Sequence, residues 1–391
     1  MNPREATQPC KKSFDVVMLA TVHDATDDRV FYREARSLRK AGFSVCVMAP
    51  HVSSEVRDDI WIEALPKQSS HVRRLLQGAT LFRKALHFGD ALFIFHDSEL
   101  FPVALLLRLC GRRVVYDCHE NLPMQVLQKN WLPRPVRRLL APLAWGTEYF
   151  GSRLLSGVLV ARDSIVKRFP KNRTISVRNY PTSEALSVSV GPPIAERKNI
   201  VIYAGGLSRV RGIAEIVEAI RSINVPGTEL WLVGPFDSQA FEQEILCSLP
   251  AHASWKGKMQ HSEVVKLYAN AKIGMSTLHP TPSHRNSQPV KLYEYLGAGL
   301  PVVASNFPEF SELLRGCGVQ VDAQNVEEIR TAVRNLLLDN VALEKMSNTG
   351  RERILNSYCW DREADRLVQF CHKLSTPKRP SAEKSSVQIE K

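Results

Sequence analysis

The chain alternates short apolar runs with longer amphipathic segments, and this pattern predicts strands and helices in regular succession. Residues 14–21 and 43–50 each place apolar side chains at four or more consecutive positions, as strands buried on both faces do. Between them, residues 30–42 put apolar side chains at helical spacing and end at Gly42. The order strand, helix, strand is typical of a doubly wound α/β domain with a parallel sheet.

A second series of the same kind begins at residue 199. Residues 199–220 give an apolar strand, two adjacent glycines and then an amphipathic helix. Further pairs of strand and helix follow. Among them, residues 286–305 predict a loop, a short capped helix and the buried strand PVVAS. The chain therefore carries two α/β halves of similar size and no tandem repeat.

Shifts in composition place the boundaries between these halves. The first domain is predicted over residues 1–181 and the second over residues 199–357. Residues 182–198 are predicted to be a linker, because serine, proline and glycine mix there without periodicity. We expect a helix over about residues 358–374 to pack back on the first domain. Residues 375–391 have the polar composition of a disordered tail.

The overall composition agrees with this organisation. The 391 residues are 44% hydrophobic and 24% charged, which provides enough apolar side chains for two cores. No run of about eighteen uncharged apolar residues predicts a membrane-spanning helix, and the N-terminal segment lacks the apolar region of a secretory signal. Eight cysteines are scattered without CxxC pairs, which favours free thiols in a reducing compartment. We therefore expect a cytoplasmic location.

Positive charge is concentrated in the first half. Residues 1–180 hold 28 Lys and Arg against 17 Asp and Glu, a balance of +11 out of +12 for the whole chain. Residues 71–88 and 124–150 interleave basic with large apolar side chains, as do helices on a membrane surface and ordinary helices packed on a sheet. The charge predicts an anionic partner: nucleic acid, a phosphate-bearing substrate or an anionic membrane. No nucleic-acid recognition motif is evident, which disfavours the first of these.

Two predicted strands of the first domain, at residues 91–100 and 112–123, end in histidines and carboxylates. The polar side chains at these strand ends are His96, Asp97, Asp117, His119 and Glu120. A lone histidine is more often structural. Because ligands of open α/β sheets bind beyond the carboxyl ends of the strands, two such clusters together predict a site. No GxGxxG motif follows the first strand, so a dinucleotide site there is not expected.

The second domain carries the features of a phosphate site. Gly205 and Gly206 allow the backbone to approach a ligand closely, and Arg209 and Arg211 just beyond them can grip a phosphate. The N-terminus of the short helix predicted within residues 286–305 directs free N–H groups outward, where anions bind. Helical spacing turns Glu294 to the same crevice, where a carboxylate can take ribose hydroxyls, although a solvated helix position would also explain it.

These residues resemble the motifs of glycosyltransferase family 4, a large family of retaining, nucleotide-sugar-dependent enzymes, and the resemblance covers residues 14–374. The family's strand ending in Gly-Arg-Leu is matched by Gly205–Gly206–Leu207, so a glycine stands at the arginine position and Arg209 is a candidate substitute. The family's E-x7-E motif falls on Asn286 and Glu294 and is followed by the usual Gly-x-Pro-Val-Val-Ala-Ser. An asparagine can still hydrogen-bond sugar hydroxyls, but it carries no charge.

The resemblance implies the GT-B fold, an α/β architecture of two Rossmann-like doubly wound domains facing across a cleft. It implies a retaining glycosyltransferase of the hexosyltransferase type, which moves a sugar from a nucleotide diphosphate-sugar to a glycan or polyprenyl-diphosphate-linked acceptor. The motif form resembles bacterial enzymes of surface polysaccharide biosynthesis. No DxD motif is evident, so we expect neither a metal nor a resident cofactor; the nucleotide-sugar is a co-substrate. The basic first half suits a peripheral position on the anionic inner face of a membrane.

The resemblance also assigns roles to single residues. The residues expected at the reacting groups are Asp117, His119, Glu120 and Asn286. Those expected at the donor are Gly205, Gly206, Arg209, Arg211, Gln288, Pro289, Val290, Lys291 and Glu294. Those expected at the acceptor are Asp28, Arg29, His96 and Asp97. We assign His119 to positioning rather than to proton abstraction, because in retaining transfer the leaving phosphate can take the proton of the acceptor.

Two other functions are compatible with the sequence. A nucleotide-sugar 2-epimerase of the same fold would act on the nucleotide-sugar itself, and product analysis without an acceptor would identify it. The departures from the family pattern at Gly206 and Asn286 are also compatible with a relative that binds a nucleotide-sugar without transferring it. Such a protein would bind nucleotide and show no turnover on any acceptor.

Overall fold

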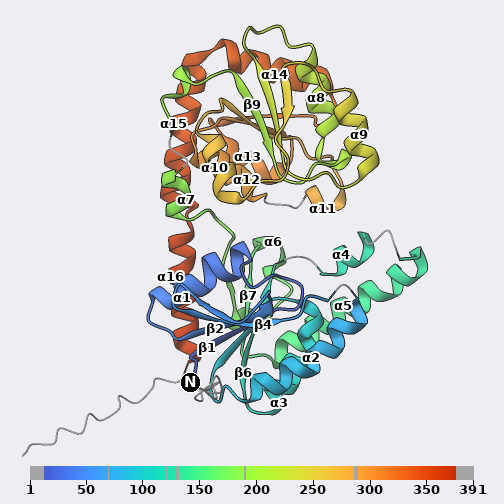
Figure 1. The fold of residues 1–391 in the computed structure, drawn as a ribbon, viewed down its shortest axis with the longest axis vertical. Helices are drawn as coiled ribbons and strands as arrows, with labels where there is room; N and C mark the ends of the chain where they lie inside the picture. The colour runs from blue at the N-terminus through green and yellow to red at the C-terminus, as the bar shows by residue number, and fades with distance from the viewer. Residues whose placement is uncertain are drawn as a thin grey trace, which may run out of the picture. The chain divides into compact units, whose positions relative to one another are not determined.

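The computed structural model describes residues 13–68, 70–119, 122–128, 132–188, 191–285 and 289–375. The predictions for Glu120, Asn286, Gln288 and the tail beyond residue 375 therefore lie outside the described residues. The chain forms two compact α/β units (Figure 1). One contains the described residues up to Arg178 together with those from Glu363 onward, and the other contains Asn179–Arg362. Among the described residues, no helix combines the length and apolar character that crossing a membrane would require.

The first unit is built on an eight-stranded sheet with the order β3-β4-β2-β1-β5-β6-β7-β8. The strands are β1 (Val16–Leu19), β2 (Val45–Pro50), β3 (Glu55–Arg57), β4 (Ile60–Leu65), β5 (Leu92–Phe95), β6 (Arg113–Cys118), β7 (Gly157–Val160) and β8 (Thr174–Ser176). Every pairing is parallel except that of the edge strand β3 with β4. The predicted doubly wound order is therefore confirmed in this half.

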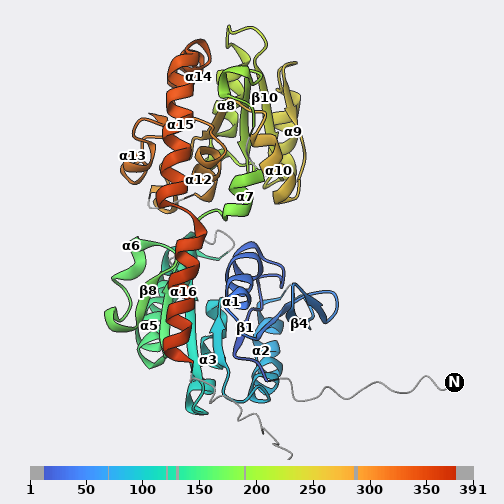
Figure 2. The same cartoon turned by 90° about the vertical axis from the view of Figure 1, so that its left-hand side faces the viewer.

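Helices cover both faces of this sheet (Figures 1 and 2). They are η1 (Asp28–Ala35), α1 (Arg36–Lys40), α2 (His71–Leu86), η2 (Ser98–Leu100), α3 (Phe101–Leu109), α4 (Leu122–Gln128), α5 (Arg134–Leu154), α6 (Asp163–Val166), η3 (Lys171–Arg173) and α16 (Trp360–Leu374). The helix predicted over residues 30–42 begins as a π-helix, η1. Asp27 caps it by accepting hydrogen bonds from the N–H groups of Arg29 and Val30.

Helix α16 brings the chain back to the first unit from Glu363 onward (Figure 2). The ring of Phe370 lies directly against Gly157, where a Cβ atom would collide with it. The guanidinium of Arg113 donates a 2.9 Å hydrogen bond to the carbonyl of Leu374. Leu367 and Cys371 are fully buried. The last turns of α16 are therefore part of the core of the first unit.

The second unit has a six-stranded, wholly parallel sheet with the order β11-β10-β9-β12-β13-β14. The strands are β9 (Ile200–Ala204), β10 (Glu229–Val233), β11 (Ala253–Trp255), β12 (Ile273–Ser276), β13 (Val302–Ser305) and β14 (Gly318–Val321). Successive residues of β9 enter different cores: Ile200 and Ile202 pack into one cluster, Val201 and Tyr203 into another. Because both faces are covered, these strands are apolar at nearly every position.

The helices of the second unit follow the strands in alternation. They are α7 (Ser183–Val188), η4 (Ile194–Glu196), η5 (Arg209–Arg211), α8 (Ile213–Arg221), α9 (Gln239–Cys247), α10 (His261–Tyr268), α11 (Pro282–Arg285), α12 (Val290–Gly297), α13 (Pro308–Leu314), α14 (Val326–Leu338) and α15 (Asn340–Ser357). The segment 182–198 thus carries α7 and η4. Within it, the guanidinium of Arg197 donates hydrogen bonds to the carbonyls of Tyr268, Ala271 and Ala298.

Candidate active site

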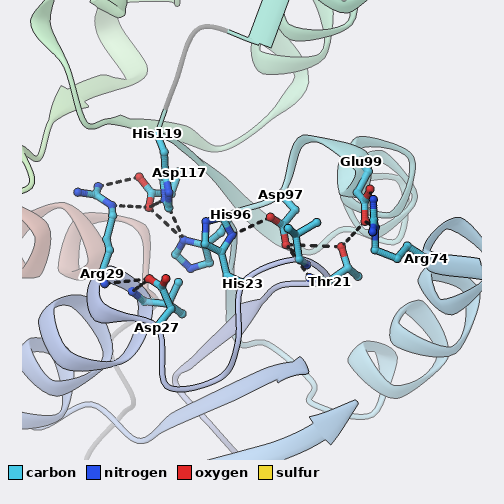
Figure 3. A network of polar contacts seen from close by, with 12 residues as sticks. Thr21, His23, Asp27, Arg29, Arg74, His96, Asp97, Glu99, Asp117 and His119 are labelled. Atoms are coloured by element: carbon cyan, nitrogen blue, oxygen red, sulfur yellow. Dashed lines mark hydrogen bonds and ion pairs between the residues drawn. The ribbon is translucent and has the colours of Figure 1, made fainter. Parts of the chain in front are cut away.

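In the first unit, polar side chains gather where β1, β5 and β6 end (Figure 3). His23 follows β1, His96 and Asp97 follow β5, and Asp117 and His119 lie at the end of β6. These three strands are neighbours in a parallel sheet, so their carboxyl ends meet at one edge. The predicted meeting of the two histidine and carboxylate clusters is therefore observed. His23 was not predicted, although it lies in the polar stretch directly after the first strand.

Asp117 is the centre of this cluster. Its two carboxylate oxygens accept hydrogen bonds from Nη2 and Nε of Arg29 at 2.8 and 2.9 Å, and Oδ2 also contacts His96 Nδ1 at 3.0 Å and His119 Nε2 at 2.5 Å. Burial opposes ionisation, but Arg29 and His119 hold the pKa of Asp117 well below its usual range. Asp117 is a buried carboxylate that positions two imidazoles.

The structure revises the expectation for Arg29. Its side chain is only 4% exposed, and its guanidinium is engaged by Asp117, by Glu34 and by the carbonyl of Val177. No open face is left for an acceptor, so its role is to hold Asp117. Asp28, the other residue predicted beside it, starts η1 and forms an ion pair at 2.6 Å with Arg33, with half of its side chain exposed.

Asp97 joins the loops that follow β1 and β5. Its carboxylate accepts hydrogen bonds from the N–H groups of Thr21 and Val22 at 2.6 and 2.8 Å and pairs with His23 Nδ1 at 2.7 Å. Burial disfavours the charged form, but His23 and these N–H groups lower the pKa of Asp97 to about 2. Asp97 is 6% exposed. It joins two loops of the site and also lines the cavity described below, and its contact with an acceptor stays a prediction.

His96 is the buried imidazole of the cluster. Its Nδ1 lies next to Asp117, and its Nε2 is buried with no hydrogen-bond partner in the described part of the chain. Burial lowers the pKa of His96, which keeps the ring neutral at physiological pH. When Nδ1 donates to Asp117, Nε2 carries a free lone pair.

His23 provides a pH-dependent contact within this cluster. Burial lowers its pKa, but the hydrogen bond and the charge of Asp97 outweigh this, so the pKa of His23 lies above its ordinary value of 6.5. When folding raises the pKa of a group, its protonated form stabilises the folded protein. This stabilisation is complete at a pH below the pKa of the group in the unfolded chain, and it is lost as the pH rises through the pKa of the group in the folded protein. We expect the difference in free energy of unfolding between the wild type and His23→Gln to be larger at about pH 5 than at about pH 9 in urea titrations. Equal differences at both pH values would contradict this account.

A cavity of about 700 Å³ opens beside these residues in the first unit. The polar side of the cavity is formed by His23, His96, Asp97, Ser98, Glu99, Tyr116 and His119. Its other walls come from α2, α4 and α5 and are mainly apolar. Arg74 of α2 also lines the cavity and forms an ion pair with Glu99 at 2.9 Å. Both histidines line this ligand-sized space, but only His119 has an accessible side chain, 18% exposed, while the side chain of His96 is fully buried.

His96, Asp117 and His119 also form a set of three possible metal ligands, whose donor atoms lie within 4.8 Å of one another. The contacts of Asp117 argue against a metal there. Both of its oxygens are held by the guanidinium of Arg29, and a cation next to that guanidinium would be repelled. The donor set therefore fits a hydrogen-bonded cluster better than a metal centre.

The second unit presents a cationic pocket where β9 ends. Gly205 has a φ of +131° and Gly206 follows it, and a Cβ atom on Gly205 would lie 3.0 Å from Lys291 Nζ. Lys291 Nζ lies 3.8 Å from the ring centroid of Tyr203 and is buried with no hydrogen-bond acceptor among the described residues. The guanidinium of Arg211 lies on the other side, 3.4 Å from the carbonyl of Gly206. The sequence predicted this grouping of glycines and cations.

Lys291 is a buried cation that contacts the ring of Tyr203 and forms no ion pair among the described residues. Burial lowers the pKa of its ammonium group, and the charge of Arg211 acts in the same direction, while Tyr203 and Glu294 oppose the shift. A buried ammonium with no partner is costly, and an anion bound at the pocket would relieve that cost.

The other predicted donor residues are placed differently from one another. Glu294 on α12 contacts His261 Nε2 at 2.7 Å and accepts a hydrogen bond from the hydroxyl of Tyr268 at 3.3 Å. Pro289 precedes α12 in extended conformation, and Val290 is the first residue of the helix. Arg209 forms an ion pair with Glu244 on α9 and lies over the ring of Phe241. Arg209 is thus tied to α9, and Arg211 is the arginine that reaches the glycines.

Comparison with known proteins gives a class for this arrangement. Residues 189–353 match the family described as Glycosyl transferases group 1. A glycogen synthase and a GDP-mannose-dependent alpha-(1-6)-phosphatidylinositol monomannoside mannosyltransferase, both from Mycobacterium tuberculosis, are 25% identical to the chain over 175 and 185 residues. These matches cover 43% and 45% of the chain but only 41% and 48% of the relatives, so the chain spans less than half of their length.

Longer matches are found with other proteins. The putative teichuronic acid biosynthesis glycosyltransferase TuaH of Bacillus subtilis is 24% identical over 305 residues, which are 66% of this chain and 75% of TuaH. A solved sucrose-phosphate synthase from Thermosynechococcus elongatus has a TM-score of 0.68 at 18% identity, over 92% of this chain and 98% of that one. Anabaena HepE, solved with UDP-glucose, has a TM-score of 0.69 at 14% identity, over 92% and 100% of the two chains.

Together these similarities confirm the coarse prediction. The likeness to solved structures shows that the two parallel-sheet units have the GT-B fold. The match over residues 189–353 and the curated relatives support a GT-B glycosyltransferase. Because the named relatives are transferases, they favour sugar transfer over the epimerase alternative.

Proposed function

We propose that the protein is a retaining, metal-independent glycosyltransferase of surface polysaccharide biosynthesis. In this proposal it takes a sugar from a nucleotide diphosphate-sugar and attaches it to a glycan or a polyprenyl-diphosphate-linked glycan. It works in the cytoplasm, at the inner face of an anionic membrane. The observation that carries the proposal is the buried ammonium of Lys291 beside the Gly205–Gly206 turn. It has no hydrogen-bond acceptor among the described residues, and a diphosphate bound there would supply one.

The donor would bind at the end of β9. Its diphosphate would lie at Gly205–Gly206 beside Lys291 and Arg211, whose cationic groups are 3.0 and 3.5 Å from the position that a Cβ atom on Gly205 would take. Glu294 would accept hydrogen bonds from the ribose hydroxyls, with His261 and Tyr268 holding its carboxylate in place. The Anabaena HepE structures with UDP and with UDP-glucose support a nucleotide-sugar as the ligand of this fold.

The acceptor would occupy the cavity of the first unit. His119, held by Asp117, would orient the reacting groups, and the buried His96 would support Asp117 from inside the unit. In the proposed reaction the acceptor oxygen bonds to the anomeric carbon while the bond from that carbon to the diphosphate breaks. The proton of the acceptor passes to the leaving diphosphate. Lys291 and Arg211 stabilise the charge that develops on the diphosphate, so no metal is required.

A thermal-shift screen tests the donor site. The purified chain is heated with UDP, GDP, ADP, CDP and dTDP in turn, beside the variants Glu294→Ala and Glu312→Ala. We expect one nucleotide to raise the melting temperature by about 5–10 °C when it is present at roughly a hundred times its dissociation constant. Glu294→Ala should lose most of this shift, because the carboxylate that holds the ribose is gone.

Glu312 is the matched control, since it is an exposed glutamate on α13. Its replacement should leave the shift unchanged. If none of the five nucleotides stabilises the wild type, or if both variants lose the shift equally, the proposed donor site is wrong.

A further inference from the structure

Helix α5 exposes a continuous apolar stripe. Its exposed apolar side chains are Val136, Leu139, Leu143, Phe150 and Leu154, with 39% to 72% of each accessible. Their spacing of three, four and seven residues puts all of them on one side of the helix. A stripe of this length on a helix of 21 residues is not the scattered exposure of single apolar residues that most surfaces show.

The opposite side of α5 is fixed to the unit, so the stripe cannot turn inward. Glu148 is 1% exposed, accepts a hydrogen bond of 3.0 Å from the hydroxyl of Tyr116 and forms an ion pair with Arg168. Gly151 is packed against the ring of Phe101, where a Cβ atom would lie 2.8 Å from the ring. These contacts leave the apolar stripe as a permanent part of the surface.

The stripe is continuous with the cavity that contains the two histidines. Leu143 belongs to the stripe and also lines the cavity, together with Leu140 and Ala144 of the same helix. Helix α2 contributes Leu75 to the cavity, and this residue is 57% exposed. The cavity therefore has a polar end at the imidazoles and an apolar end that opens onto α5.

Aromatic rings and cations lie on another face of α5, where Trp145 and Arg138 are turned about 100° or more around the helix from the stripe. Trp145 and Tyr149 stack at a centroid distance of 4.7 Å, and the guanidinium of Arg153 lies 3.4 Å from the ring centroid of Tyr149. Arg138 precedes this stack on the same face and is exposed. Helix α5 therefore carries exposed arginines and rings in addition to the apolar stripe, and this composition is found in helices at the boundary between anionic head groups and lipid chains.

We infer that the cavity takes an acceptor with an apolar chain, that is, a phosphate-bearing lipid. Its polar head lies at His119, and its chain leaves between Leu75 and Leu143 to run along the α5 stripe. The inference rests on the proposed function for the statement that this lipid is an acceptor. It selects the lipid-linked class from the two acceptor classes proposed above. Binding of the chain itself depends only on the cavity and the stripe.

The test measures how affinity depends on chain length. Pyrophosphate, geranyl diphosphate and farnesyl diphosphate are titrated into the full chain below their aggregation concentrations, with tryptophan fluorescence as the readout. We expect affinity to rise along this series by about tenfold or more for each five-carbon unit, because apolar area is buried. Leu143→Gln and Leu75→Gln should each weaken farnesyl diphosphate about tenfold and leave pyrophosphate unchanged.

Both of these leucines are more than half exposed, so the variants should fold normally, and their melting temperatures verify this. Leu109→Gln is the matched control: Leu109 is 84% exposed on α3 and does not line the cavity. Equal affinity for pyrophosphate and farnesyl diphosphate would overturn the inference, and so would an equal loss in the Leu109→Gln control. A third outcome is that affinity rises with chain length but no nucleotide stabilises the protein in the thermal-shift screen. This outcome would support the lipid inference and overturn the proposed transferase function.

Discussion

Replacing Arg29 with alanine should lower the free energy of unfolding of the first unit by about 3–5 kcal/mol, since it leaves the buried carboxylate of Asp117 without its cation. Arg29 holds both oxygens of Asp117 and lies 2.9 Å from Glu34. Asp117 and Glu34 are fully buried, so water cannot replace the lost interactions. Urea unfolding of the full chain, followed by a spectroscopic probe of the first unit, measures the effect.

The loss should also depend on pH in a defined direction. Arg29 depresses the pKa of Asp117, so its contribution is present above the pKa of about 3.9 of a free aspartate and fades as the pH falls below it. We therefore expect the gap between the wild type and Arg29→Ala to narrow on acidification. Lys67→Ala is the control, because the ion pair of Lys67 with Asp24 is largely exposed and should contribute less than about 1 kcal/mol. Equal losses in the two variants would refute the account of the buried cluster.

Replacing Lys291 with methionine should lower kcat/KM for the donor by about 10²–10³-fold, because the cation that meets the leaving diphosphate is removed. The same change should not lower the melting temperature. Burial lowers the pKa of Lys291, which means that its charged form opposes folding at neutral pH, and methionine fills similar space without that cost. We therefore expect Lys291→Met to lower kcat/KM without lowering the melting temperature.

Ligand binding separates this role from a general loss of structure. Lys291→Met should weaken the nucleoside diphosphate that stabilises the wild type and should leave the corresponding nucleoside unaffected, as titration calorimetry would show. Lys266→Ala serves as the control, since Lys266 is an exposed residue of the neighbouring helix α10. A parallel loss of nucleoside binding, or a melting temperature lowered by several degrees, would point to a structural role for Lys291.

The apolar pattern predicted the architecture well, because buried parallel strands are apolar along their whole length. Strands were expected at residues 14–21, 43–50 and 91–100, and β1, β2 and β5 lie there. The convergence of His96 with Asp117 was also predictable, since it follows from two neighbouring parallel strands ending at one edge. The apolar pattern of the sequence thus predicts where each strand lies and which side chains stand at its end.

The roles of single residues were less predictable, because they depend on partners far away in the sequence. Arg29 meets Asp117 across 88 residues, and Thr21 meets Asp97 across 76, so neither appears buried when the sequence is read locally. Arg209 forms an ion pair with Glu244, which lies 35 residues further along the chain, and no rule of local spacing predicts this pair. The missed residue His23 had one usable signal, its place at the end of the first strand.

The return of the chain at α16 has a consequence for folding during synthesis. Residues 179–362 form one uninterrupted stretch, so the second unit can acquire its native contacts as soon as that stretch leaves the ribosome. The first unit cannot, because Gly157 packs against Phe370 and Arg113 bonds to Leu374, and these partners are translated 213 and 261 residues later. The N-terminal half is thus made first and completed last. During that interval, nascent chains should expose the surface that α16 covers, which makes this half the natural client of a chaperone.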